Sequence, residues 1–174
     1  GLTFEAVAPD CDEDALKATG LQVEELVTQL ARQKAESVAA RYPGALVIGS
    51  DQAAELDGEI LGKPGTAEAA RAQLRRLSGR DHRLLTATAV VETSTGRIAE
   101  DLDVHHLRLR ELTDAQIARY VAVDDPVDCA GAYKIEGLGI SLFERVRGDD
   151  FTAVIGLPLT RLVALLARFG VELP

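Results

Sequence analysis

The chain has 174 residues, a formal net charge of −9 and 47% apolar residues, with no Trp or Met. This length suits one domain, or two closely joined lobes, with a core of Leu, Val, Ile and Ala. The acidic balance argues against a nucleic-acid-coating protein, although a nucleotide substrate needs only a few local cations. We therefore expect no nucleic-acid partner. No stretch reaches membrane length and no signal peptide is visible, so we also expect no membrane partner and a cytoplasmic location. Cys11 and Cys129 are expected to be free thiols.

The first half of the chain predicts a strand, a helix and a second strand. Alternation from Leu2 to Val7 predicts a short strand, and an apolar stripe over residues 23–42 predicts a helix. Lys34 lies in phase with this stripe, so its side chain either snorkels from the edge of the stripe or is held inward to meet an anion. The apolar run 45–48 predicts a buried strand that ends at Gly49. Asp51 would then lie at the carboxyl end of a strand, where ligands collect in open α/β sheets.

The second half mixes helices and strands without a repeat. Asp57-Gly58 predicts a hairpin, and Thr66 and Thr113 are predicted to cap helices. The other predicted elements are strands at 84–92, 98–109 and 140–146, a helix ending near Val121, and a last helix at 159–169. This pattern predicts an α/β (α+β) fold with a mixed sheet.

Several chemistries find no support in the motifs. His105 and His106 lie on one strand and point to opposite faces, so we interpret them, with His82, as sheet-surface residues and expect no zinc site. No Walker sequence and no Gly-x-Ser-x-Gly elbow are present. What remains is a set of acids and lysines: Glu13, Lys34, Asp51 and Lys63. A carboxylate can hold a divalent metal or accept a proton from water, and a lysine can neutralise phosphate.

Segments along nearly the whole chain resemble the Maf family of nucleoside triphosphate pyrophosphatases. The longest are Ile48-Gly49-Ser50-Asp51-Gln52, Asp57-Gly58-Glu59-Ile60-Leu61-Gly62-Lys63-Pro64, Asp128-Cys129-Ala130-Gly131-Ala132-Tyr133 and Val154-Ile155-Gly156-Leu157-Pro158-Leu159. The resemblance implies one domain over residues 1–174, similar to the inosine-triphosphate pyrophosphatases, with two lobes, a mixed sheet and a central cleft for the nucleotide. It also implies cleavage between the α and β phosphates with a divalent metal, for which Mg²⁺ or Mn²⁺ suits oxygen ligands, and a possible homodimer.

The resemblance assigns roles to particular residues. Asp51 matches the family's proton acceptor, Lys34 and Lys63 match its phosphate-binding lysines, and Glu13 matches an acid that would hold the metal together with Asp51. The family also opens with a strand followed by Ser-x-Ser-x-x-Arg-Arg. That segment would lie before Gly1 and is not in this sequence, and its true absence would put triphosphate binding in doubt.

Two positions bear on the choice of base. Relatives that act on thymidine and uridine triphosphates tend to carry Thr and Gln where this chain has Gln52 and Glu136, and residues 139–145 look like the 7-methyl-GTP branch. A glutamate offers two acceptors to N1–H and N2–H of guanine, and N7 methylation makes the base cationic. Glu136 is alternatively a solvated loop acid. A pyrophosphatase for dTTP or UTP, and a non-catalytic nucleotide-binding regulator of septum formation, are the other open functions. The role of Cys129, where many relatives carry Lys, has no explanation in the sequence.

Overall fold

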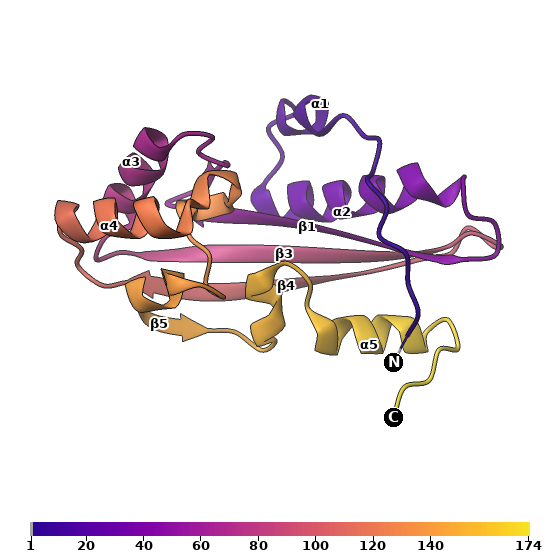
Figure 1. The fold of residues 1–174 in the computed structure, drawn as a ribbon. Coiled ribbons are helices and arrows are strands. Elements are labelled where there is room, and N and C mark those ends of the chain that lie inside the picture. Colours follow the sequence, from indigo (N-terminus) through magenta and orange to yellow (C-terminus); the bar gives the residue numbers. More distant parts are fainter. Residues whose placement is uncertain (1) are drawn as a thin grey trace. The chain divides into compact units, whose positions relative to one another are not determined.

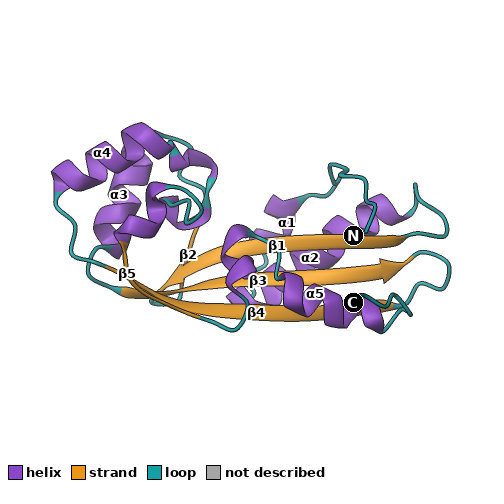
Figure 2. Ribbon diagram, turned by 60° about the horizontal axis from the view of Figure 1, so that its bottom comes forward, coloured by secondary structure: helices purple, strands orange, loops and turns teal. Residues whose placement is uncertain are grey.

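The structure, a computed structural model, describes residues 2–174 and contains a five-stranded sheet (Figure 1). The strands pair in the order β2-β1-β3-β4-β5 (Figure 2). They are β1 (Leu46–Leu56), β2 (Glu59–Leu61), β3 (Asp81–Glu92), β4 (Ile98–Leu109) and β5 (Phe143–Arg147). The α-helices are α1 (Glu13–Lys17), α2 (Val23–Ala39), α3 (Ala67–Leu77), α4 (Asp114–Asp124) and α5 (Leu159–Ala167). Short 3-10 helices are η1 (Pro126–Asp128), η2 (Ala130–Ala132), η3 (Leu138–Leu142) and η4 (Phe151–Ile155).

The chain divides into two units. The first contains the chain up to Asp51, with Ala87–Leu102 and Thr160–Pro174, and the second contains Gln52–Thr86 and Asp103–Leu159. The long strands β1, β3 and β4 contribute residues to both units. Among residues 2–174, no helix combines the length and the apolar character needed to cross a bilayer.

In the first unit, α2 packs its apolar stripe inward. Its buried side chains are Val23, Leu26, Val27, Leu30, Ala31, Ala35 and Val38. Gly49 of β1 makes this packing close, because a Cβ on that residue would lie 2.2 Å from the Ala31 carbonyl oxygen and 2.7 Å from the Ala35 nitrogen. Only glycine allows helix and strand backbones to approach so nearly. The close approach fixes where the side chains of α2 meet β1.

In the second unit, local signals place the elements as the sequence predicts. Thr66 and Thr113 cap α3 and α4 with their side-chain oxygens, and Thr113 forms a full capping box with Gln116. Asp57-Gly58 closes a hairpin in which Leu56 pairs with Glu59. Helices α3 and α4 lie against each other (Figure 1). A core cluster joins both helices to the strands; it includes Leu56, Leu74, Leu77, Leu107, Ile117 and Tyr120.

Two predictions about strands are wrong. Residues 2–7 form no strand, and none of the five strands of the sheet includes that segment. β1 does not end at Gly49 but continues through Asp51 to Leu56. Asp51 therefore lies in the middle of a strand, and the glycine serves close helix packing instead of a break.

The α/β (α+β) class predicted from the sequence is confirmed, with a difference in the sheet. The sequence predicts a mixed sheet, which has parallel and antiparallel pairs. In the structure both edge strands pair antiparallel, β2 with β1 and β5 with β4. The histidines also differ from the expectation of a sheet surface. His82 and His105 are buried, and His105 Nδ1 lies 2.7 Å from Asp103 Oδ1. Only His106 of the three is exposed.

Candidate active site

A half-buried lysine and two carboxylates meet in the first unit. The Lys34 Nζ of α2 donates to Asp51 Oδ1 of β1 at 2.6 Å and lies 3.0 Å from Glu13 Oε1 of α1. The side chains of Lys34 and Asp51 are 20% and 12% exposed. The inward interpretation of Lys34 is therefore confirmed, because its ammonium meets an anion and does not snorkel. Three of the residues predicted for the site lie in direct contact.

The charges in this cluster adjust one another. Burial raises the pKa of Asp51, and this effect exceeds the lowering by the hydrogen bond and charge of Lys34. Burial alone would lower the pKa of Lys34, but Asp51 and Glu13 outweigh burial and raise the pKa. For Glu13, hydrogen bonds to Lys17 and Lys34 outweigh burial and lower the pKa. A carboxylate with a raised pKa is a stronger base, while Lys34 and Glu13 stay ionised beside it.

Lys17 belongs to the same cluster and was missed in the sequence. Its Nζ donates to Glu13 Oε2 at 3.0 Å, so Glu13 accepts from two lysines at once. The i, i+4 spacing of Glu13 and Lys17 on a helix was the available signal. Because Lys17 touches Glu13 but not Asp51, it offers a matched comparison for Lys34.

Carboxylate oxygens are the type of donor that a hard divalent cation prefers, and here both carboxylates contact Lys34. Among residues 2–174, no group of three or more His, Cys, Asp or Glu side chains is arranged to hold a metal. Magnesium is commonly held by one or two carboxylates together with substrate phosphates, without a complete cage of protein ligands. Glu13 and Asp51 match that donor set, and the remaining ligands would be phosphate and water oxygens.

Lys63 and Glu136 lie in the second unit, and the charges of both act on the pKa of the Cys129 thiol. The charges that act on the half-buried Cys129 thiol come from Lys134, Glu136, Asp128 and Lys63, although burial is the main cause of its raised pKa. The segment after Lys63 is held to η1 by a hydrogen bond of 2.8 Å from the amide of Gly65 to the Val127 carbonyl.

Gln52 lies in a different environment from its neighbour Asp51. Successive residues of a strand point to opposite faces, so Gln52 faces away from the side on which Asp51 meets Lys34. Its amide nitrogen donates to Thr86 Oγ1 at 2.9 Å and to the Ala153 carbonyl of η4 at 2.8 Å. The bond to Ala153 holds η4 to β1, and the bond to Thr86 joins β1 to β3. The prediction that Gln52 influences the choice of base remains a prediction.

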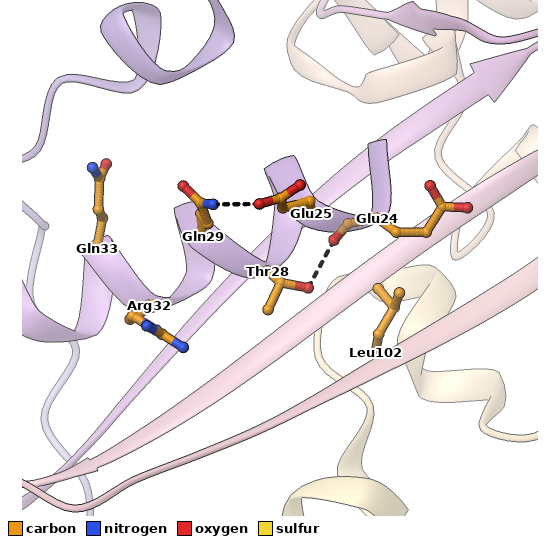
Figure 3. A pocket seen from close by; sticks show the side chains of 7 residues that line it. All are labelled: Glu24, Glu25, Thr28, Gln29, Arg32, Gln33 and Leu102. Carbon is orange, nitrogen blue, oxygen red and sulfur yellow. Dashed lines mark hydrogen bonds between the residues drawn. The ribbon is translucent and has the colours of Figure 1, made fainter. Parts of the chain in front are cut away.

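A separate hollow of about 640 Å³ lies on the outer side of α2. Figure 3 shows the side chains that line it, which are Glu24, Glu25, Thr28, Gln29, Arg32, Gln33 and Leu102. None of the residues predicted for the site is among them. Arg32, its one cation, is neutralised by a paired hydrogen bond to Glu100, at 2.7 Å for each nitrogen. Two further acids at its rim disfavour a phosphate ligand, so we do not place the site here.

An α/β fold with a partly buried carboxylate paired to a lysine is typical of enzymes that handle phosphate groups. The chain belongs to the Maf family: the family described as Maf-like protein matches residues 1–169. It is 48% identical over 173 residues to a Pseudomonas aeruginosa protein named 7-methyl-GTP pyrophosphatase, covering 99% of this chain and 89% of that protein. Proteins of the same name from Xanthomonas campestris and Pseudomonas putida are each 47% identical over 99% of this chain, which covers 88% and 89% of them.

Proposed function

We propose that this protein hydrolyses 7-methyl-GTP between the α and β phosphates, giving 7-methyl-GMP and pyrophosphate. The observation that carries the chemistry is the contact of Asp51 with Lys34 at 2.6 Å, because it places a base of raised pKa beside a cation for phosphate. The relatives named 7-methyl-GTP pyrophosphatase support the choice of nucleotide. Pyrophosphatases are hydrolases acting on phosphorus-containing acid anhydrides.

The proposed reaction is an in-line displacement at the α phosphorus. A water oxygen forms a bond to that phosphorus while the bond from the phosphorus to the α–β bridging oxygen breaks, and pyrophosphate leaves with the bond's electron pair. Asp51 accepts the proton that the water loses. Lys34 and Lys63 stabilise the negative charge that develops on the phosphoryl oxygens.

Glu13 and Asp51 would hold a divalent cation, for which Mg²⁺ or Mn²⁺ is proposed. When bound, such an ion neutralises phosphate charge and orients the oxygens. Lys17 then has a defined task, since its hydrogen bond of 3.0 Å keeps Glu13 ionised and directed toward the cluster. We propose further that the protein works in the cytoplasm on a free nucleotide, without a nucleic-acid or membrane partner, and forms a homodimer.

Base recognition is proposed to rest on Glu136. Its exposed carboxylate can accept from N1–H and N2–H of a guanine, a pairing that uracil and thymine cannot supply. The methylated base is cationic, so an acid beside it adds Coulomb attraction. Gln52 is proposed to act on base preference indirectly, through its bonds to Thr86 and η4.

The test is pyrophosphate release with Mg²⁺ across 7-methyl-GTP, GTP, UTP and dTTP. We expect the highest kcat/KM on 7-methyl-GTP and a loss of about 100- to 10,000-fold in Asp51→Asn, the range found for a general base. Asp14→Asn is the matched control, because Asp14 is an exposed carboxylate of the same helix as Glu13.

Other outcomes separate the alternatives. Highest turnover on UTP or dTTP would retain the Asp51 chemistry and refute the base assignment. Nucleotide binding without any turnover would favour the non-catalytic regulator of septum formation.

A further inference from the structure

The glycine-rich segment of residues 134–139, here called the Glu136 loop, is fastened at both ends to the carboxyl end of α4. α4 ends at Asp124, and its C-cap Asp125 has a left-handed φ of 43°. A helix that ends in this way leaves backbone carbonyls without helical partners and carries partial negative charge. The end of α4 therefore offers acceptors for a cation.

Lys134 supplies that cation at the start of the loop. Its Nζ donates to the carbonyl oxygens of Asp124 at 2.9 Å and of Asp125 at 3.0 Å. Its backbone amide donates to the Tyr120 hydroxyl at 2.8 Å. An ammonium has three donors, and two of them are used here for backbone carbonyls. This lysine is thus engaged in holding the loop, in contrast to Lys34, whose partners are carboxylates.

Asp124 holds the other end of the loop. Its Oδ2 accepts from the amide of Gly139 at 3.1 Å, and the amide of Gly137 donates to the Lys134 carbonyl at 3.1 Å. A Cβ on Gly139 would lie 2.1 Å from the Lys134 carbonyl oxygen, and one on Gly137 would lie 2.9 Å from Asp124 Oδ2. The two glycines therefore let the loop fold tightly against Lys134 and Asp124. The exposed Glu136 lies in the loop between Lys134 and Gly139.

We propose that Lys134 and Asp124 are positioning residues for base selection, which fix the Glu136 loop to α4 so that the Glu136 carboxylate is presented in one place. Neither residue touches the substrate in this proposal; both act through Glu136. The inference rests on the proposed function, because it assumes that Glu136 pairs with the guanine edge. A carboxylate on an unfastened loop would have to be ordered at the moment of binding, and part of the preference would be lost.

The experiment compares Lys134→Met with Arg76→Met, which also removes a long cation, one that pairs with Glu59 on the surface of the same unit. We expect Lys134→Met to raise KM for 7-methyl-GTP with little change in kcat, and to lower the preference for 7-methyl-GTP over UTP several-fold. Glu136→Gln alone should lower the preference for 7-methyl-GTP over UTP by about 10- to 100-fold, the worth of a hydrogen bond to a charged group. Adding Lys134→Met to Glu136→Gln should lower this preference no further.

Hydrogen exchange of the free protein provides a readout that does not depend on turnover. The Gly137 and Gly139 amides should exchange faster in Lys134→Met and Asp124→Ala than in Arg76→Met, and Lys134→Arg should restore slow exchange. If Lys134→Met does not fold, Asp124→Ala carries the same comparison, since it removes the oxygen that accepts from the Gly139 amide.

Three results would overturn the proposal. The first is that Lys134→Met lowers the preference for 7-methyl-GTP equally in the wild type and in Glu136→Gln. The second is that it speeds exchange of the loop amides but leaves the preference unchanged, and the third is that it leaves the exchange unchanged. A wild-type enzyme without preference for 7-methyl-GTP over UTP would instead refute the base assignment itself. The exchange data would then still report whether the anchors hold the loop, so the two failures are distinguishable.

Discussion

Replacing Lys34 with Met should move the acid limb of the pH–rate profile to higher pH. The substitution keeps most of the apolar stem and removes the ammonium that lies 2.6 Å from Asp51 Oδ1. Asp51 must be ionised to accept a proton, so the rate falls as the pH drops through its pKa. Burial already raises that pKa, and Lys34 opposes the rise. Without Lys34 the pKa of Asp51 rises further, and activity is lost at a higher pH than in the wild type.

The size of the shift follows from the geometry. An opposite charge this close lowers the pKa of a carboxyl group by about 1–3 units, so its removal should shift the limb upward by a similar amount. Each unit corresponds to about 1.4 kcal/mol of differential interaction. Since Lys34 and Asp51 are only 20% and 12% exposed, solvent screening reduces this value little. Loss of a charged phosphate contact should also lower kcat/KM at the plateau by roughly 10- to 150-fold.

The assay is kcat/KM for 7-methyl-GTP between pH 4.5 and pH 9 at constant ionic strength, values chosen to span roughly the carboxylate range and above. Lys17→Met is the control, because Lys17 donates to Glu13 at 3.0 Å and not to Asp51. Its charge lowers the pKa of Asp51 less than that of Lys34 does, so Lys17→Met should move the limb upward far less than Lys34→Met. An unmoved limb in Lys34→Met, or one displaced to lower pH, would refute the assignment of Asp51 as the titrating base.

Three further substitutions test the packing and the pH response. Gly49→Ala should destabilise the protein by about 1–3 kcal/mol, or roughly 2–12 °C in Tm, whereas Gly62→Ala, with no atom within 4 Å of its Cβ, should have little effect in the same thermal melt. Burial lowers the pKa of His82 to about 4 from 6.5. The unfolded chain then binds the proton first, so unfolding free energy should fall by up to about 3 kcal/mol as the pH drops through that window. This part of the slope should vanish in His82→Phe in denaturant titrations. Gln52→Thr should loosen η4, which should appear as faster exchange of the Ala153 amide. Unchanged exchange in this variant would show that the hydrogen bond from Gln52 to the Ala153 carbonyl does not hold η4.

Elements fixed by neighbouring residues were predictable from the sequence. The capping box at Thr113 and the Asp57-Gly58 turn depend on groups only a few residues apart, and both form as predicted. Residues 2–7 alternate like a strand but form none, because a strand needs a partner that alternation does not supply. Gly49 was misinterpreted for a similar reason. In the sequence, a glycine that ends a strand cannot be told from one that lets a helix backbone pack closely against the strand, because the position of the helix is not known.

The site divides in the same way between local and distant information. Lys34 could be recognised because helical periodicity placed a charge on an apolar face, and the structure supplies its partner, Asp51. Lys134 could not be assigned, because its acceptors are two carbonyl oxygens at the end of α4 and a carbonyl carries no signature in the sequence. The burial of His82 and His105 likewise depends on elements that cover the sheet.

The alternation of β1 has a consequence for how base preference could depend on residue 52. Asp51 and Gln52 are adjacent, yet one meets Lys34 of α2 and the other meets Thr86 and η4. If Asp51 is the base, as proposed, a side chain on the opposite face of β1 reaches the nucleotide only through a change in the strand. A change of preference on replacing Gln52 should therefore come with altered exchange at η4. Replacing Glu136 should change the preference while η4 stays protected, and this contrast separates a direct contact with the base from an effect carried through packing.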